Sequence, residues 1–283
     1  MSEKVITSYK GFDKNMKCRG FQYEVGKEYE MDGEIKCCNR GFHACKSPME
    51  AWDYYDMLNS RYAEVEQSGK IDAEENSTKV CSSRIKIKAE LKLSDIINIG
   101  VEWLKDITSP SKVKADGVLN DNGNRRKQIG SSGDYAKIGS SGYSAKIGSS
   151  GYSAKIGSSG DSAKIGSSGD YAKIGSSGDS AQIGSSSYSA KIGSSGDSAK
   201  IGSSGDYAKI DSTGEDSVIM CAGNSSIAKA KVGSWITLAE WKWSNEKKRD
   251  VPVCVKTEYV DGDNIKADTW YQLKNRKFVE VNE

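Results

Sequence analysis

An isoleucine recurs at every ninth position through the middle of this chain. The set comprises Ile129, Ile138, Ile147, Ile156, Ile165, Ile174, Ile183, Ile192, Ile201 and Ile210. The repeat around each is G-D-Y-A-K-I-G-S-S, so Ala and Ile lie two residues apart and share one side of a β-strand. One such strand cannot bury its Ile alone, but stacked copies can. The period therefore predicts a parallel β-solenoid with an Ile column and an Ala column inside.

The tyrosines of the repeat indicate how many repeats make one coil. Counted from Gly133, the odd-numbered repeats each carry one tyrosine: Tyr135, Tyr152, Tyr171, Tyr188 and Tyr207. Among the even-numbered repeats, only the second does, at Tyr143. A coil of two repeats sorts these residues into a tyrosine face and an Asp-Ser face, whereas a coil of three would mix them. We therefore expect a flattened, two-sided roll of about four and a half coils, each separated by ~4.8 Å.

The tyrosine face is the candidate contact surface of the solenoid. Tyr152 and Tyr188 come one position earlier in their repeats, so we expect a zigzag row with these two near the turn and the other three on the strand. The Ser-Ser-Gly-Asp segment supplies the turn, with Gly free to take a positive φ. Exposed aromatic rows often mark contact surfaces. The alternative is that the rings only stack on one another along the ladder.

The repeat disfavours two known uses of similar solenoids. Calcium-binding rolls have Asp two positions before the apolar residue, where this chain has Ala. Ice-binding solenoids present ranks of Thr, but the outward residue between Ala and Ile here is Lys. Such lysines can follow phosphates, yet a formal net charge of only +2 provides no overall field for nucleic acid or a membrane. We expect the lysines to solvate the roll and block edge pairing.

Composition divides the chain into three parts. We expect a small α+β domain over residues 1–112, the nonapeptide solenoid over 113–234 and a β-rich cap over 235–283. The stretch 107–128 contains Pro, Gly and Asn and is the expected connection into the repeat. The seven cysteines are odd in number and scattered, the N-terminus lacks an apolar signal segment, and no apolar run approaches about 18 residues. These features predict reduced thiols and a cytoplasmic protein.

The N-terminal part combines strand and helix patterns. Apolar and polar residues alternate over 21–38 well enough to predict a β-hairpin with Asp32-Gly33 as its turn. A helix is expected next, with Ser47 as its N-cap, Pro48 as its first residue and Glu50 as its third residue. Further strands are predicted at 61–71 and 82–91, followed by a helix after Ser94.

Three segments of this part resemble a family of uncharacterised proteins of tailed phages and prophages. They are "YKGFDKNMKCRGFQYEVGKEYE", "GFHAC" and "SRYAEVEQSG", within roughly residues 8–105. The solenoid and the tail "GSWITLAEW…CVKTEYVDGDNIKADTWYQL" are similar as well. The resemblance implies a phage origin and an intracellular accessory role, and it assigns no catalytic residue.

His43 is the only histidine of the chain and lies near three cysteines, Cys37, Cys38 and Cys45. This spacing departs from the C-x₂-C or H-x₃-H pairs of zinc sites, so we expect buried cysteines, a hydrogen-bonded histidine and no metal. His43 and Cys45 are two apart on an expected strand and would face one side. That arrangement leaves open a nucleophilic Cys/His pair or a ligand contact.

Arg19 and Arg40 are the candidate anion contacts, since each is followed by Gly-Phe. Both can equally be surface charges at turns. The chain shows no nucleophile elbow, Walker A loop, metalloprotease motif or dinucleotide fingerprint, and we expect no cofactor.

These observations favour a non-enzymatic accessory protein that binds and blocks or sequesters a host component, such as one of antiviral defence. The alternatives are an enzyme or binder of a nucleotide-like ligand that uses the His43 region, and a structural or oligomerising phage protein. The partner would be a host protein, a nucleotide-like ligand or a second copy of the chain. We expect neither nucleic acid nor a membrane as a partner.

Overall fold

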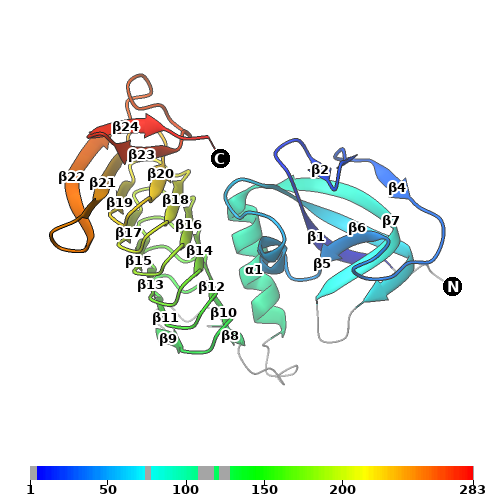
Figure 1. The fold of residues 1–283 in the computed structure, drawn as a ribbon. Helices are drawn as coiled ribbons and strands as arrows, with labels where there is room; N and C mark the ends of the chain where they lie inside the picture. Colours follow the sequence, from blue (N-terminus) through cyan, green and yellow to red (C-terminus); the bar gives the residue numbers. More distant parts are fainter. Residues whose placement is uncertain (1–4, 74–77, 108–117, 121–127, 283) are drawn as a thin grey trace. The chain divides into compact units, whose positions relative to one another are not determined.

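The computed structural model describes residues 5–73, 78–107, 118–120 and 128–282 (Figure 1). Most of the expected connection at 107–128 lies outside these residues. The chain forms two compact units, Met1–Trp103 and Leu104–Glu283. The prediction of a mainly β chain with a parallel solenoid, a small N-terminal α+β domain and a C-terminal strand cap is confirmed.

The N-terminal unit is an antiparallel sheet that closes on itself. Its elements are β1 (Ile6–Phe12), β2 (Lys17–Cys18), β3 (Phe21–Gln22), β4 (Glu28–Glu30), β5 (Phe42–Cys45), the 3-10 helix η1 (Pro48–Asp53), β6 (Arg61–Ala73), β7 (Lys79–Leu91) and α1 (Leu93–Ile107). Strand β1 pairs with β5, β5 with β7, β7 with β6, and β6 again with β1. Phe12, Val65 and Ile85 are fully buried inside this ring.

The hairpin predicted within 21–38 is wrong in its pairing. Strand β3 pairs with β2, and β4 pairs with β7. The turn is Arg19-Gly20, whose φ values are +50° and +80°. Two successive positive φ values match the twist of a two-residue hairpin, but an Arg in the first place is not the usual sequence signal. The sequence pattern therefore pointed to Asp32-Gly33 instead.

The other local predictions for this unit hold with small changes. Ser47 precedes a helix with Pro48 in its first turn, but the helix is η1, and the Ser47 side chain makes no capping hydrogen bond. The two predicted strands are β6 and β7, each 13 residues long. The predicted helix after Ser94 is α1, which begins at Leu93.

The solenoid consists of two parallel sheets to which alternate repeats contribute. Its strands are β8 (Val118–Asn120), β9 (Gln128–Ser131), β10 (Lys137–Ser140), β11 (Lys146–Ser149), β12 (Lys155–Ser158), β13 (Lys164–Ser167), β14 (Lys173–Ser176), β15 (Gln182–Ser185), β16 (Lys191–Ser194), β17 (Lys200–Ser203), β18 (Lys209–Ser212), β19 (Val218–Cys221), β20 (Ile227–Lys229) and β21 (Trp235–Ser244). Ile138 pairs with Ile156, and Ile147 with Ile165, so one coil is two repeats, as predicted. The roll has about six turns, because β19 and β21 still pair in register with the strands before them although they lack the nine-residue consensus sequence.

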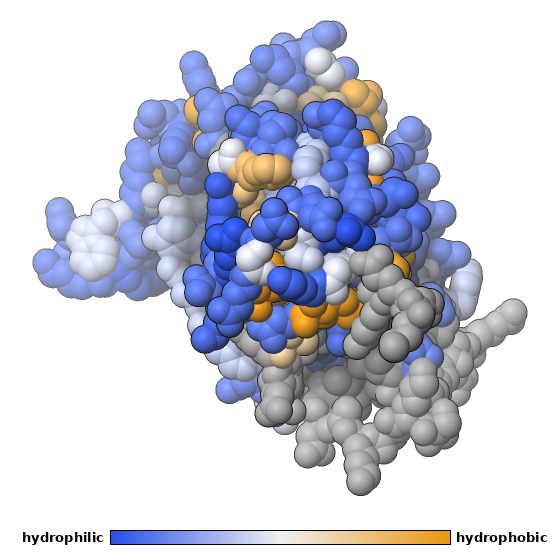
Figure 2. All heavy atoms as spheres, turned by 90° about the vertical axis from the view of Figure 1, so that its right-hand side faces the viewer, coloured by the Kyte–Doolittle hydropathy of each residue, from blue (hydrophilic) through white to orange (hydrophobic). Residues whose placement is uncertain are grey.

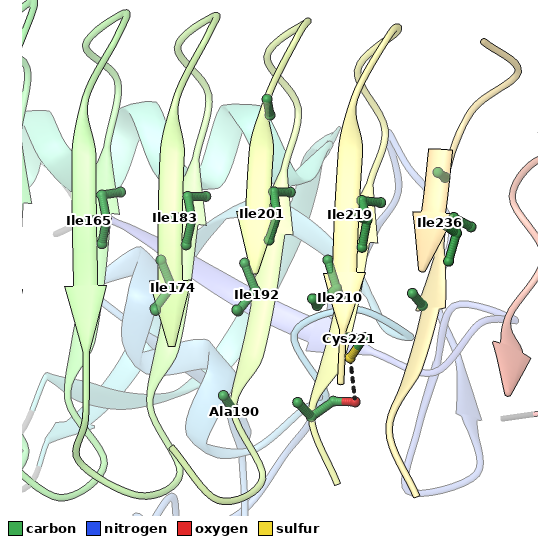
Figure 3. Close-up of a cluster of buried hydrophobic side chains, with 14 of the residues drawn as sticks. Ile165, Ile174, Ile183, Ala190, Ile192, Ile201, Ile210, Ile219, Cys221 and Ile236 are labelled. Carbon is green, nitrogen blue, oxygen red and sulfur yellow. Dashed lines mark hydrogen bonds between the residues drawn. The ribbon is translucent and has the colours of Figure 1, made fainter. Parts of the chain in front are cut away.

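The interior of the roll contains the predicted Ile and Ala columns. Ile165, Ile174 and Ile183 belong to this stack (Figure 3), and Ile174 is fully buried. A third column is serine, which the sequence analysis did not assign to the interior. Ser158, Ser176 and other serines two positions after each Ile are buried because they point to the same side of the strand.

The turns of the roll differ from the prediction in two ways. The positive φ falls on the third position of the repeat, as at Tyr171 (+58°) and Ser162 (+55°), and not on the glycine. Consequently no tyrosine of the row lies on a strand. The glycine is instead required by the close stacking of neighbouring coils. A Cβ on Gly169 would lie 2.0 Å from the carbonyl oxygen of Gly151 in the coil before. Ser187 occupies one such position, so one coil accommodates a side chain there.

Antiparallel strands close the C-terminal end of both sheets. Strand β21 forms the last rung with β19 and then pairs with β22 (Arg249–Tyr259). Strand β20 pairs with β23 (Tyr271–Lys274), which forms a hairpin with β24 (Lys277–Glu280). These strands cover the edges that a growing ladder would otherwise offer to another chain. In the described part of the chain, no helix has the length and apolar character needed to cross a membrane.

Candidate ligand cavity in the N-terminal domain

The N-terminal domain contains a cavity of about 880 Å³, and seven of the residues that line it are aromatic. The aromatic lining is Tyr9, Phe21, Tyr23, Tyr29, Phe42, Tyr54 and Tyr55. The cationic lining is Lys10, Arg19 and Lys79, and the anionic lining is Glu28 and Glu30, which both form ion pairs with Arg84. Small-molecule sites typically have volumes of ~300–1000 Å³ and a few placed polar groups among apolar ones. In size and lining, this cavity matches such a site.

Strand β3, the residue that follows it and β4 build one wall of the cavity from a cluster of rings. Phe21, Tyr23 and Tyr29 contact one another edge to face, with centroids 4.8 to 5.3 Å apart. Phe21 is nevertheless exposed. On the face shown in Figure 2, several small hydrophobic patches lie among mostly hydrophilic residues. An exposed ring beside buried ones gives the wall an open edge on which a planar ligand can stack.

Lys10 brings a buried charge to the cavity from β1. Its Nζ donates to the carbonyl oxygen of His43 at 2.9 Å and contacts the sulfur of Cys18 at 3.4 Å. The same atom lies 5.6 Å from the ring centroids of Phe12 and Tyr23. Burial lowers the pKa of the Lys10 amine. Among the described residues no carboxylate forms an ion pair with it, and its two contacts are the His43 carbonyl oxygen and the Cys18 sulfur.

Tyr55 covers β1 at Gly11 and reaches the Cys18 sulfur that Lys10 also contacts. A Cβ on Gly11 would lie 2.4 Å from the Tyr55 ring, so only glycine leaves room for this packing. The Tyr55 hydroxyl donates to Cys18 Sγ at 2.7 Å, and burial raises the pKa of this phenol. Lys10 and Tyr55 therefore meet at one thiol, beside the aromatic wall.

His43 lies on β5, and its side chain is half-buried. Its Nε2 accepts the backbone N–H of Cys38 at 3.0 Å. Burial and then the nearby charge of Lys10 lower the pKa of the imidazole. Cys45 is on the same strand, but burial raises the pKa of its thiol to about 12, and no hydrogen bond joins it to His43 among the described contacts. This geometry provides no activated Cys/His nucleophile.

The two candidate arginines lie in different places. Arg19 is an exposed residue at the cavity, in the turn of the β2–β3 hairpin. Arg40 donates from its guanidinium to the carbonyl oxygen of Asp32 at 2.7 Å and does not line the cavity. Arg19 is thus placed for an anion contact at the cavity, whereas Arg40 supports a neighbouring loop.

Each two-repeat coil contributes one tyrosine to the row, as predicted. Successive rings of Tyr135, Tyr152, Tyr171, Tyr188 and Tyr207 are in contact, with centroids 5.3 to 5.8 Å apart. Each of the five remains 41 to 66% exposed. Stacking of the rings is therefore a feature of the fold, and their role as a contact surface stays a prediction.

The sequence analysis missed Lys10. Side chains of β1 point alternately into and out of the sheet. The inward positions are Ser8, Lys10 and Phe12, all of them buried. A lysine in an inward position of an alternating strand was the available signal.

Comparison with known proteins supports an uncharacterised family for this domain. Residues 6–99 match a family described as Domain of unknown function (DUF7666). The match covers about a third of the chain and includes every residue that lines the cavity. Searches of curated proteins and of solved structures find no match.

Proposed function

We propose that this chain is a binding protein whose N-terminal domain takes up a small, aromatic and anionic molecule of the nucleotide class. The observation that carries the proposal is the buried ammonium group of Lys10, which no carboxylate neutralises among the described residues. A buried charge without a counter-charge is costly, and an anionic ligand supplies one. The stacked rings of Phe21, Tyr23 and Tyr29 offer apolar contact to a base.

The resemblance to phage and prophage proteins extends this proposal to a role. A phage accessory protein that takes up such a ligand would sequester it from the host, including from antiviral defence. The solenoid then serves as a rigid carrier, and its tyrosine face contacts a host protein or a second copy of the chain. No proton transfer or nucleophilic step is required, so the chain need not be an enzyme.

Calorimetric titration with nucleoside monophosphates and diphosphates tests the binding. We expect saturable binding of at least one nucleotide and much weaker binding of the matching uncharged nucleoside. Lys10→Met should abolish nucleotide binding while leaving thermal stability unchanged or higher, because it removes a buried, uncompensated charge. Lys17→Met, at an exposed lysine of β2 outside the cavity lining, is the matched control and should bind normally.

Two outcomes would overturn the proposal. One is the absence of binding by any nucleotide in the panel. The other is a Lys10→Met variant that binds like the wild type, or one that loses both stability and binding, which would make Lys10 a structural residue.

A further inference from the structure

Three side chains that are far apart in the sequence meet beside the cavity. One ligand atom each from Cys37, His43 and Cys81 lies within 4.8 Å of the other two. The sequence analysis considered the cysteines near His43 in the chain and excluded a metal on their spacing. Cys81 was not among them, because it comes from β7.

Strand register explains how the cluster forms. His43 of β5 lies directly opposite Cys81 of β7, and Cys81 lies opposite Asp72 of β6. Directly opposed residues of antiparallel strands project to the same side with Cβ atoms ~4.5–5.5 Å apart. Cys37 then comes from the loop before β5, where its backbone N–H donates to Asp72 Oδ2 at 2.7 Å.

The loop that carries Cys37 is a tight turn shaped around the sulfur of Cys81. Lys36 and Arg40 exchange backbone hydrogen bonds of 2.9 Å, which places Cys37 and Cys38 at its tip. Cys38 has a left-handed backbone, with φ +63°. A side chain on Gly41 would collide with Cys81 Sγ, so glycine is needed for this approach.

The acceptor groups around the cluster suit a cation. The Asp72 carboxylate lies beside Cys37, whose backbone N–H it accepts. Cys81 donates to the carbonyl oxygen of Arg40 at 3.1 Å, and Cys37 to that of Asp72 at 3.5 Å. A divalent cation would displace both thiol protons and offset the repulsion between the sulfurs and the carboxylate.

We propose that Cys37, His43 and Cys81 form a binding site for a divalent cation of the zinc class. Two thiolates and a neutral imidazole are the ligands that Zn²⁺ prefers, and three protein ligands leave a fourth position open. Binding releases the two thiol protons to solvent. The imidazole gives up its hydrogen bond from Cys38 if Nε2 is the ligand atom. Both Cys37 and His43 are only half-buried, so the cation can enter from solvent.

The two cysteines of the site are separate from the Lys10 charge that carries the proposed function. His43 lines the cavity, but Cys37 and Cys81 do not. Substitutions of either cysteine can therefore remove metal binding without removing Lys10, and Lys10→Met leaves all three ligands in place.

The metal content of the full-length chain tests the proposal. The protein is dialysed first against Zn²⁺ and then against metal-free buffer, and the retained metal is measured. We expect about one equivalent of retained zinc and, with Co²⁺ instead, a thiolate-to-cobalt absorption band. Cys37→Ser and Cys81→Ser should each lose the retained zinc and the band. Cys254→Ser, a half-buried thiol in the C-terminal cap, is the matched control and should keep both. Zn²⁺ should also raise the unfolding midpoint of the wild type but not of Cys37→Ser.

Wild-type protein that retains no zinc would overturn the proposal. A Cys37→Ser variant that retains as much zinc as the wild type would do the same, and this half-buried position still provides a test if Cys81→Ser fails to fold. Lys10→Met should keep the metal even where nucleotide binding is lost.

Discussion

Gly41 and Cys81 are in such close contact that the sulfur occupies the space of a side chain on the glycine. A Cβ on Gly41 would lie 2.0 Å from Cys81 Sγ, and the glycine has φ +134°. Through this contact β7 brings its thiol to the loop that carries Cys37. The glycine of the "GFHAC" segment is therefore a packing requirement of the cysteine cluster.

Gly41→Ala should destabilise the N-terminal domain strongly. The positive φ alone costs about 1–3 kcal/mol for a residue with a side chain, and the clash with Cys81 adds to it. Gly26→Ala is the matched control, because Gly26 has φ +86° and nothing within 4 Å of its Cβ position. Urea unfolding should show a clearly larger loss for Gly41→Ala. Equal losses would mean that the sulfur contact is unimportant.

Ile165→Asp tests the inward isoleucine column. Ile165 is buried between Ile147 and Ile183 of the neighbouring coils. An unpaired carboxylate there should cost about 3 kcal/mol or more. The adjacent, exposed Lys164 is the control, and Lys164→Ala should stay within about 0.5 kcal/mol. The unfolding midpoint measures both, and similar midpoints for the two variants would contradict the column.

The solenoid could be predicted from the sequence because each of its constraints repeats. A nine-residue period places Ile at the same point of every coil, and the tyrosine alternation shows that two repeats make one coil. The turn could not be predicted as well. Tyr171 takes the positive φ, whereas Gly169 is needed because the distance between stacked coils leaves no room for a side chain there. That distance is a tertiary property that local turn preferences do not contain.

Replacing the five row tyrosines with Ser tests the tyrosine face. Ser occurs naturally at the left-handed turn position of Tyr135, Tyr171 and Tyr207, for example at Ser162, so the backbone should be kept there. Tyr152 and Tyr188 lie one position earlier and do not have a positive φ. Four ring contacts would be lost, at about 0.5 kcal/mol or more each. If the face is a contact surface, light scattering should also show a change in oligomeric state, or a host partner should no longer bind.

The control for this variant is Tyr143→Ser. Tyr143 is exposed, and no ring contact joins it to another aromatic residue among those the structure describes. A five-fold variant that folds and keeps its oligomeric state and partner would show that the row is scaffold only.

The candidate sites of the N-terminal domain were only partly predictable. His43 was found because it is the one histidine, and Arg19 because of its Arg-Gly-Phe context. The partner of His43 could not be found, since Cys81 lies 38 positions away and meets it only through the register of β5 and β7. Lys10 was hidden for a similar reason, because its burial depends on which side of β1 faces the closed sheet.

Asp211 is a departure from the repeat that places a carboxyl group where other coils have glycine. It pairs in register with Gly193 of the coil before and is almost fully buried. Its Oδ2 lies 3.0 Å from Lys229 Nζ, while its Oδ1 is buried without a hydrogen-bond partner among the described residues. Burial raises the pKa of this carboxyl group despite the opposing charge of Lys229, and Asp268 raises it further, while Lys231 acts in the other direction.

This raised pKa predicts a loss of stability with increasing pH that Asp211→Asn should remove. Below the ordinary value near 3.8, the carboxyl group is protonated in both states and costs nothing extra. As the pH rises through that value, the unfolded chain ionises first, so the folded state becomes relatively less stable until its own, higher pKa is passed. Urea unfolding of Asp211→Asn relative to the wild type should therefore show a growing advantage for the variant above about pH 4. Asp263→Asn, at an exposed residue of the cap, should show no such trend, and a constant difference between Asp211→Asn and the wild type would refute the raised pKa.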